Sequence, residues 1–208
     1  YKRQVSANMA VPAEKIDAFL VSKAEFILNA QKKFALQEQY KPQPKQYVSG
    51  ETFYLQGRAL RLKVIRASKE QLYSDGVHLF LEVKDPQDFS KKERMVMRFF
   101  DRQCKEVFGE IVEELYPVFQ KYGVAVPSLR IRSMDTRWGS CLPGKGVITL
   151  NKRLLEAPRN CIEYVVMHEL CHFIHPNHSK HFYAFLSMLM PDWKERKKVL
   201  DANDTYYL

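Results

Sequence analysis

Hydrophobic and polar positions alternate with two different periods along this chain, and the changes of period divide it into helical and extended segments. After Pro12, apolar residues recur at helical spacing as far as Phe34, which predicts one long amphipathic helix. Three strand-like segments follow, separated by turns that contain glycine, and we expect them to form a small antiparallel sheet. The predicted strands are Thr52–Leu55, Leu60–Ile65 and Val77–Val83.

The second half of the chain repeats this change of period. Residues from about Ser90 to Tyr122 return to helical spacing with one continuous apolar stripe. Alternation resumes over residues 129–134, and a further strand is predicted over Val147–Asn151, so a second sheet is expected. This order of elements predicts an α+β protein, in which residues 1–88 form a helix and a β-rich subdomain and residues 89–208 form the core domain.

Five of the six histidines of the chain fall between positions 168 and 181. His168 and His172 are four positions apart, so on a helix both side chains lie on one face and can hold a single ion through their imidazole nitrogens. Glu169 lies beside that pair, where its carboxylate can take a proton from a water that a zinc ion has made acidic. This HExxH pattern predicts a catalytic zinc site and a hydrolytic reaction.

The residues around the pattern favour a helix buried beneath a cleft. Uncharged residues precede the motif and fill it, whereas charged ones would have indicated a surface helix. Asn160 followed by Glu163 predicts a capping box at the start of this helix, and Pro176 predicts its end after His175.

A catalytic zinc ion usually has a third protein ligand and keeps its fourth position for water. His175, His178 and His181 are the three candidates. On a continuous helix, His175 would lie about 10 Å along the axis from His168, too far to share a tetrahedral ion comfortably. His178 follows the predicted break in the helix and can fold back, so the spacing favours His178 without excluding the other two.

The resulting spacing, HExxHxxxxxH, is that of the metzincins, but His175 stands where those enzymes have a glycine. The apolar residues that follow recur at helical spacing. We therefore expect Met188 and Met190 in the core rather than in a methionine turn.

Several segments outside and inside the histidine cluster form a longer pattern that covers nearly the whole chain. They are Gly50–Phe53 (GETF), Arg132–Cys141 (RSMDTRWGSC), Ile148–Asn151 (ITLN), His168–His172 (HELCH), Asn177–Ser179 (NHS), Phe182 and Pro191–Arg196 (PDWKER). On these residues the chain resembles the YgjP-like metal-dependent hydrolases, small zincins that are more distantly similar to the SprT-like proteases. The helix that follows Pro12 also looks like the amino-terminal part of that family.

The resemblance implies a minimal zincin-like metallopeptidase domain with an active-site HExxH helix and a small antiparallel sheet. It implies one zinc ion per chain, held by His168, His172 and His178, with Glu169 as the general base of a metalloendopeptidase-like hydrolase. It also implies a peptide or protein substrate. We expect the chain to begin inside the family's first strands, because Lys2–Met9 has the pattern of a strand without its partner.

The strand Val147–Asn151 is expected to lie above the metal helix, where its edge could pair with the backbone of an extended peptide. Arg137 and Tyr183 are candidates for stabilising the oxyanion of the transition state. The residues expected to line the substrate site are Arg137, Trp138, Thr149 and Asn151.

The formal net charge of +9 at pH 7 admits a second class of function, because basic proteins associate with nucleic acid through phosphate contacts. The alternatives are a SprT-like protease that acts at DNA, and a zinc-stabilised module that binds nucleic acid or protein. The densest basic group is Lys194–Lys198, which Glu195 interrupts. A fourth protein ligand such as His175 or His181 would favour the module, whereas Glu169 favours catalysis.

The four cysteines form no CxxC pair, which predicts reduced thiols rather than a zinc knuckle or a redox pair. No apolar run approaches the length of a membrane span, and no signal peptide is visible. We therefore expect a cytoplasmic protein without a membrane partner. The sequence does not specify the oligomeric state.

Overall fold

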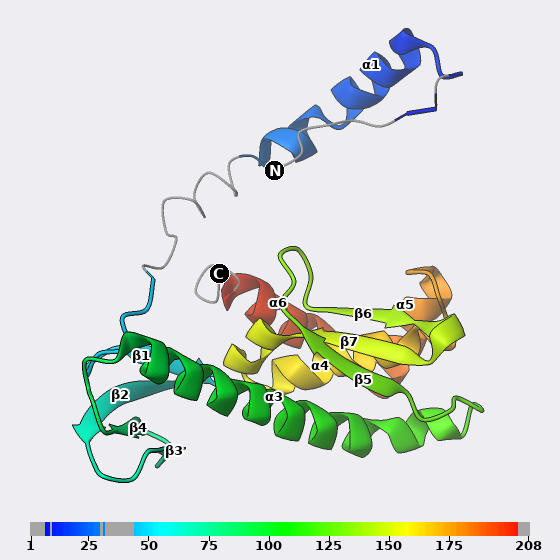
Figure 1. Cartoon of the computed structure of the whole chain (residues 1–208). Helices are drawn as coiled ribbons and strands as arrows, with labels where there is room; N and C mark the ends of the chain where they lie inside the picture. The colour runs from blue at the N-terminus through cyan, green and yellow to red at the C-terminus, as the bar shows by residue number, and fades with distance from the viewer. Residues whose placement is uncertain (1–6, 9, 30, 32–43, 204–208) are drawn as a thin grey trace. The chain divides into compact units, whose positions relative to one another are not determined.

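The structure is a computed structural model that describes residues 7, 8, 10–29, 31 and 44–203 of the 208-residue chain (Figure 1). It divides into two units, Tyr1–Gln43 with Leu208, and Pro44–Tyr207. Most of the strand predicted over Lys2–Met9 lies outside the described residues, as does Phe34.

The first unit contains helix α1 (Ala13–Ser22), which begins after Pro12. The single long helix predicted from the apolar spacing is wrong. The chain leaves the helical conformation at Lys23, where φ is −107° and ψ is 3°, and residues 24–29 are helical again. Helical stability in proteins comes mostly from packing, and α1 buries none of its residues, so no buried contact on α1 enforces a continuous helix.

The second unit begins with a four-stranded sheet whose order is β1-β2-β4-β3. Its strands are β1 (Thr52–Leu55), β2 (Arg58–Arg66), β3 (Gln71–Ser74) and β4 (His78–Val83). The three predicted strands are confirmed, but β2 and β4 are parallel rather than antiparallel. The reason is β3, an antiparallel edge strand that returns the chain between them. None of its four residues is buried, so it lacks the alternation that would have predicted it.

Helix α3 (Phe89–Gln120) joins the two sheets. It begins at Asp88, whose carboxylate accepts a hydrogen bond of 2.9 Å from the backbone N–H of Lys91. Val96 and Phe99 of α3 pack into the core beneath the first sheet, whereas its later residues, from Cys104 to Phe119, pack into the larger core beneath the second. The subdivision of the chain at residue 88 stays a prediction.

A three-stranded sheet with the order β5-β7-β6 follows. Its strands are β5 (Ser128–Arg132), β6 (Gly139–Leu142) and β7 (Val147–Asn151), and the short helix η1 (Pro143–Lys145) joins β6 to β7. β5 and β7 are parallel, and β6 pairs with β7 as an antiparallel hairpin. The α+β class predicted from the sequence is confirmed, with two mixed sheets instead of antiparallel ones.

The remaining helices contribute buried residues to the second core. They are η2 (Lys152–Glu156), α4 (Arg159–Cys171), α5 (Lys180–Leu189) and α6 (Trp193–Asn203). The predicted capping box of α4 is wrong, because Pro158 occupies the N-cap position and no side chain caps the helix. Glu163 instead accepts hydrogen bonds from Arg159 and Arg196, and so ties α4 to α6.

Two further predictions concern single side chains around this core. Met190 is buried as predicted, but Met188 is 60% exposed, so its assignment to the core is wrong. All four cysteines are free thiols, as predicted, and Cys171 is buried on α4. No helix in the described part of the chain has both the length and the apolar character needed to cross a membrane.

Candidate metal centre

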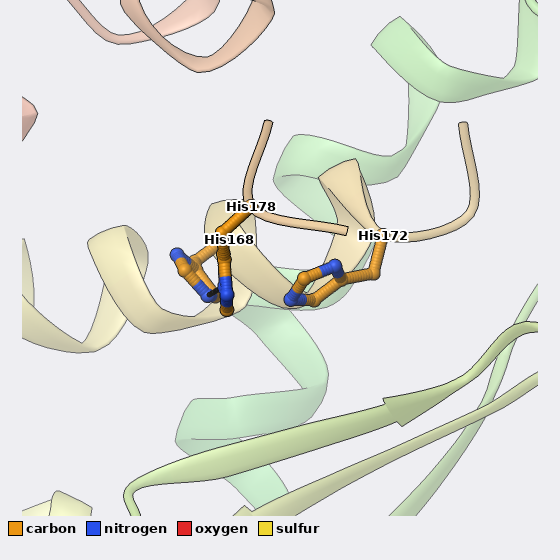
Figure 2. A group of neighbouring side chains, drawn as sticks. All are labelled: His168, His172 and His178. Carbon is orange, nitrogen blue, oxygen red and sulfur yellow. Dashed lines mark hydrogen bonds between the residues drawn. The ribbon is translucent and has the colours of Figure 1, made fainter. Parts of the chain in front are cut away.

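The last turn of α4 and the residue that ends it carry the HExxH pattern. His168 and Glu169 lie inside the helix, and His172 is its C-cap residue, so the helix ends earlier than Pro176 predicts. His168 and His172 are one turn apart, and their ring centroids lie 5.0 Å from each other. Figure 2 shows both rings together with that of His178.

His178 comes from the loop between α4 and α5, where the chain folds back over the helix as the spacing predicted (Figure 2). Its Nε2 atom lies 2.9 Å from the Nε2 atom of His168, and one nitrogen from each of the three rings lies within 4.8 Å of the others. Two nitrogens bound to one tetrahedral zinc ion at 2.0–2.1 Å are about 3.3 Å apart. The three rings therefore need only small adjustments to share an ion.

His175 and His181, the other candidates for a third ligand, do not join this group. The His175 ring instead packs against those of His181 and Phe185, at centroid distances of 6.5 and 5.4 Å. The carbonyl oxygen of His175 lies 3.2 Å from Nδ1 of His172 and can accept its proton. Such a bond selects the tautomer that leaves Nε2 of His172 free to bind a metal.

Burial keeps the imidazole rings of α4 neutral. It lowers the pKa of His168 to about 3, with smaller effects from His172 and His178, and it is also the largest cause of the lowered pKa of His172. The neutral ring is the form that offers a nitrogen lone pair to a metal. Nδ1 of His168 is also buried without a hydrogen-bond partner among the described residues. The neutral rings of His168 and His172, together with the ring of His178, offer the three nitrogen donors that fit a divalent transition ion such as zinc.

Glu169 lies next to the histidine group and is only 5% exposed. Burial raises the pKa of its carboxyl group to about 8, and the positive charge of Arg137 acts in the opposite direction. A cation held by the three histidines would likewise favour the ionised carboxylate. The protonation state of Glu169 therefore depends on whether the three histidines hold a cation.

Strand β6 passes directly against this carboxylate. A Cβ atom on Gly139 would lie 2.7 Å from Oε1 and 2.9 Å from Cγ of Glu169, closer than any side chain tolerates. Because Gly139 has no side chain, there is room beside β6 for the carboxylate of Glu169. The sequence prediction missed this residue, because a glycine marks a close approach only once it is known to lie in a strand, and no strand was predicted there.

The expectation that β7 offers a free edge to a substrate is corrected by the strand order. β7 is the central strand and pairs on both sides, whereas β6 is an edge strand of this sheet. The backbone N–H of Asn151 donates to the carbonyl of Trp138 at 2.8 Å, which makes these two residues a hydrogen-bonded pair. Since such pairs alternate along an antiparallel ladder, the backbone groups of Gly139 and Cys141 point toward the free side of β6.

The same register places two of the predicted substrate contacts, Thr149 and Asn151, on the face away from Glu169. Gly139 lies opposite Leu150, and Ser140 lies opposite Thr149. Residues directly opposite each other share a face, so Leu150 is on the face that Gly139 presents to Glu169, whereas Thr149 and Asn151 are on the other. This register does not support direct substrate contacts by Thr149 and Asn151, which stay predictions.

Asn151 is buried, and its side chain holds the loop that precedes β6 through hydrogen bonds. Its Nδ2 donates to the carbonyl oxygens of Met134 and Arg137 at 2.7 and 3.0 Å, and its Oδ1 accepts from the backbone N–H of Arg153 at 3.2 Å. These bonds leave no amide proton for a substrate. They hold the loop that carries Arg137 and Trp138.

The other two predicted contacts, Arg137 and Trp138, lie at the end of that loop. Arg137 is exposed, and its charge acts on Glu169. Trp138 is half-buried against the core, and the guanidinium group of Arg153 lies 5.7 Å from its ring centroid. Arg137 is thus the more accessible of the two.

Phe182 forms the floor beneath the three histidines, a role that the sequence prediction did not assign. Its buried ring lies 4.9, 4.8 and 4.9 Å from the rings of His168, His172 and His178. The available signal was Ser179, whose hydroxyl accepts from the backbone N–H of Phe182 and starts α5 directly after His178. The Ser179 cap thus places His178 and Phe182 within about one helical turn of each other.

The comparison with protein families identifies the class of protein. The model of the YgjP-like metallopeptidase domain matches residues 1–203, so the chain belongs to the YgjP-like family, and the resemblance found on its sequence is confirmed. This membership makes the chain a metallopeptidase, a hydrolase that acts on peptides or proteins. A comparison with curated proteins found no match.

Two solved structures are similar to part of the chain. One is the metallopeptidase zymogen abylysin of Pyrococcus abyssi, with 20% identity and a TM-score of 0.41 over 48% of this chain and 93% of that one. The other is the metallopeptidase zymogen jannalysin of Methanocaldococcus jannaschii, with 22% identity and a TM-score of 0.39 over 46% of this chain and 88% of that one.

Proposed function

We propose that this chain is a zinc-dependent metallopeptidase in which His168, His172 and His178 hold one zinc ion and Glu169 is the general base. The observation that carries the proposal is the convergence of three imidazole nitrogens within 4.8 Å of one another, directly beside a buried glutamate. When bound, zinc supplies Lewis acidity, which lowers the pKa of a water molecule and polarises a carbonyl group.

The side chains around the proposed zinc site would supply the general base and the groups that stabilise the oxyanion. Glu169, which follows His168 on α4 and whose carboxylate lies against Gly139, takes a proton from the attacking water and passes it to the leaving amine. Arg137 is the first candidate for stabilising the oxyanion or holding the substrate, since it is an exposed cation close enough to act on Glu169. Tyr183, whose ring centroid lies 6.1 Å from that of His178, is the second.

The free edge of β6 is the proposed binding site for the substrate backbone. An extended peptide can pair with the outward N–H and C=O groups of Gly139 and Cys141, and this pairing does not depend on the peptide's sequence. Gly139 lies against Glu169, so a peptide on this edge passes beside the general base. Trp138 and Arg137, just before β6, are then placed to contact its side chains.

The test of the general base is Glu169→Gln, with Glu195→Gln on the exposed face of α6 as the matched control. The amide keeps the shape of the carboxylate but cannot accept the proton. We expect Glu169→Gln to retain zinc and to lose turnover of an unstructured protein such as casein, while Glu195→Gln keeps both. Turnover by Glu169→Gln at the rate of the parent chain would refute the proposed role.

The structure does not favour the nucleic-acid alternative at the predicted basic cluster. Arg196 pairs with Glu163 and Asp192, and Lys197 pairs with Asp201. The ammonium group of Lys194 lies 5.7 Å from the centroid of its neighbour's indole ring. Most of this cluster is therefore engaged within the protein. A closed structural zinc site also lacks support, because neither His175 nor His181 belongs to the ligand group.

A further inference from the structure

The third zinc ligand of the proposed site lies on a loop, and a loop side chain has more freedom than one on a helix. His178 is in a segment without regular secondary structure between the end of α4 at Cys171 and the start of α5 at Lys180. Ordering such a side chain costs conformational entropy, which reduces the affinity for the ion unless the protein orders it beforehand. In the structure, stacked aromatic rings contact His178 and can order its side chain before the ion binds.

Three aromatic rings link His178 to the metal helix. Tyr183 stacks on His178 with 6.1 Å between ring centroids and 23° between planes, and Trp193 stacks on Tyr183 at 5.5 Å and 21°. Tyr164 then stacks on Trp193 at 6.3 Å and 14°. These three residues, Tyr183, Trp193 and Tyr164, form what we call the aromatic ladder.

The aromatic ladder closes a circuit between two of the proposed ligands. Tyr164 precedes His168 by one turn of α4, and their rings are in edge contact at 6.0 Å. The circuit thus runs from His178 through the ladder to His168, and the two histidines face each other through their Nε2 atoms at 2.9 Å. A shift of any ring in the circuit moves at least one ligand.

Each ring of the ladder stands on a different helix. Tyr164 is buried in α4, and Tyr183 projects from α5. Trp193 begins α6, and its indole N–H donates a hydrogen bond of 2.8 Å to the hydroxyl of Ser187 on α5. Because offset stacking has a preferred geometry, these anchors fix the plane against which His178 rests.

We propose that the aromatic ladder preorganises the metal centre by holding the ring of His178 in its ligating orientation, with Tyr183 and Trp193 as positioning residues. The proposal rests on the zinc site proposed above. Groups that orient a ligand typically change metal affinity by 10–100-fold when they are removed. The ladder also makes the zinc affinity depend on α6, a helix that supplies no ligand.

The test measures zinc affinity in the absence of peptide, by competition with a chromophoric chelator. We expect Tyr183→Ala and Trp193→Ala to bind zinc about 10–100-fold more weakly than the parent chain. Tyr183→Phe keeps the ring and should keep the affinity. Phe80→Ala is the matched control, because it also removes a stacked ring, 5.1 Å and 17° from Tyr73, but lies in the four-stranded sheet, which holds none of the proposed ligands; it should lower the melting temperature without changing zinc affinity.

Two further results separate the ladder from ordinary packing and from the zinc site itself. The chain has two tryptophans, so a Trp138→Phe background leaves Trp193 as the fluorophore, and its emission should change on adding zinc. Affinity equal to the parent in both Tyr183→Ala and Trp193→Ala would overturn the ladder. If His178→Ala also leaves the affinity unchanged, the proposed ligand set itself fails, and the ladder fails with it.

Discussion

Gly139→Ala tests the link between the sheet and the proposed general base, because it adds one methyl group where the structure has no room. The new Cβ would lie 2.7 Å from Oε1 of Glu169, and ordinary contacts of this kind begin at 3.4 Å. The carboxylate must therefore move by about 0.7 Å, and it cannot swing into solvent freely because Glu169 is buried.

The expected loss follows from how strictly a proton acceptor must be placed. A misplacement of about 1 Å costs roughly 100-fold in rate, so a shift of 0.7 Å predicts a fall in kcat of about 10- to 100-fold, or about 1.4–2.7 kcal/mol of barrier. The three heavy atoms nearest to the added Cβ all belong to Glu169 and none belongs to a histidine, so zinc affinity should stay at the parent level.

The assay combines steady-state peptidase kinetics with zinc affinity and a melting curve for each variant. Gly144→Ala is the matched control, since a Cβ there meets nothing within 4 Å and its backbone is not left-handed. It should behave like the parent chain. Parent-level kcat in Gly139→Ala, or an equal loss in Gly144→Ala, would refute the reasoning that β6 positions Glu169.

Three further predictions concern stability. Asn151→Ala should lower the free energy of unfolding by about 3 kcal/mol in urea titrations, because it removes the partner of three part-buried backbone groups in and after the loop that the amide braces; unchanged stability would contradict this. Burial raises the pKa of Glu156 to about 7, so the folded state binds its proton more tightly than the unfolded state, and this stabilisation is lost as pH rises from about 4.5 to 7. Glu156→Gln should therefore melt progressively higher than the parent between pH 5 and 8, and a constant difference would refute the cause. Arg196→Ala should cost about 2 kcal/mol by removing its ion pair with Glu163, which joins α6 to α4, and its pair with Asp192, whereas the exposed Lys198→Ala should change stability by less than about 0.5 kcal/mol.

The grouping of the three histidines could be predicted from the sequence, because it depends mainly on spacing along one helix. Two histidines four positions apart on α4 share a face regardless of tertiary structure. The return of His178 to that face followed from a simple length argument, since His175 is too far along the axis. Strands β2 and β4 were also predictable, because their buried positions alternate along the strand.

The surroundings of the site depend on contacts between distant segments, and no local pattern contains them. β6 is four residues long without a fully buried position, so neither the strand nor the role of Gly139 could be predicted. Without β6, β7 was taken for an edge strand, and Thr149 and Asn151 were placed on the substrate side. The aromatic ladder likewise joins three helices whose packing the apolar spacing does not specify.

The central claim is that His168, His172 and His178 hold one zinc ion, and zinc content measured by mass spectrometry after dialysis tests it most directly. The parent chain should carry one zinc ion per chain. His178→Ala should carry much less, and His181→Ala, three residues further on but outside the ligand group, should match the parent. Zinc retained by His178→Ala, or its absence from the parent chain, would contradict the account.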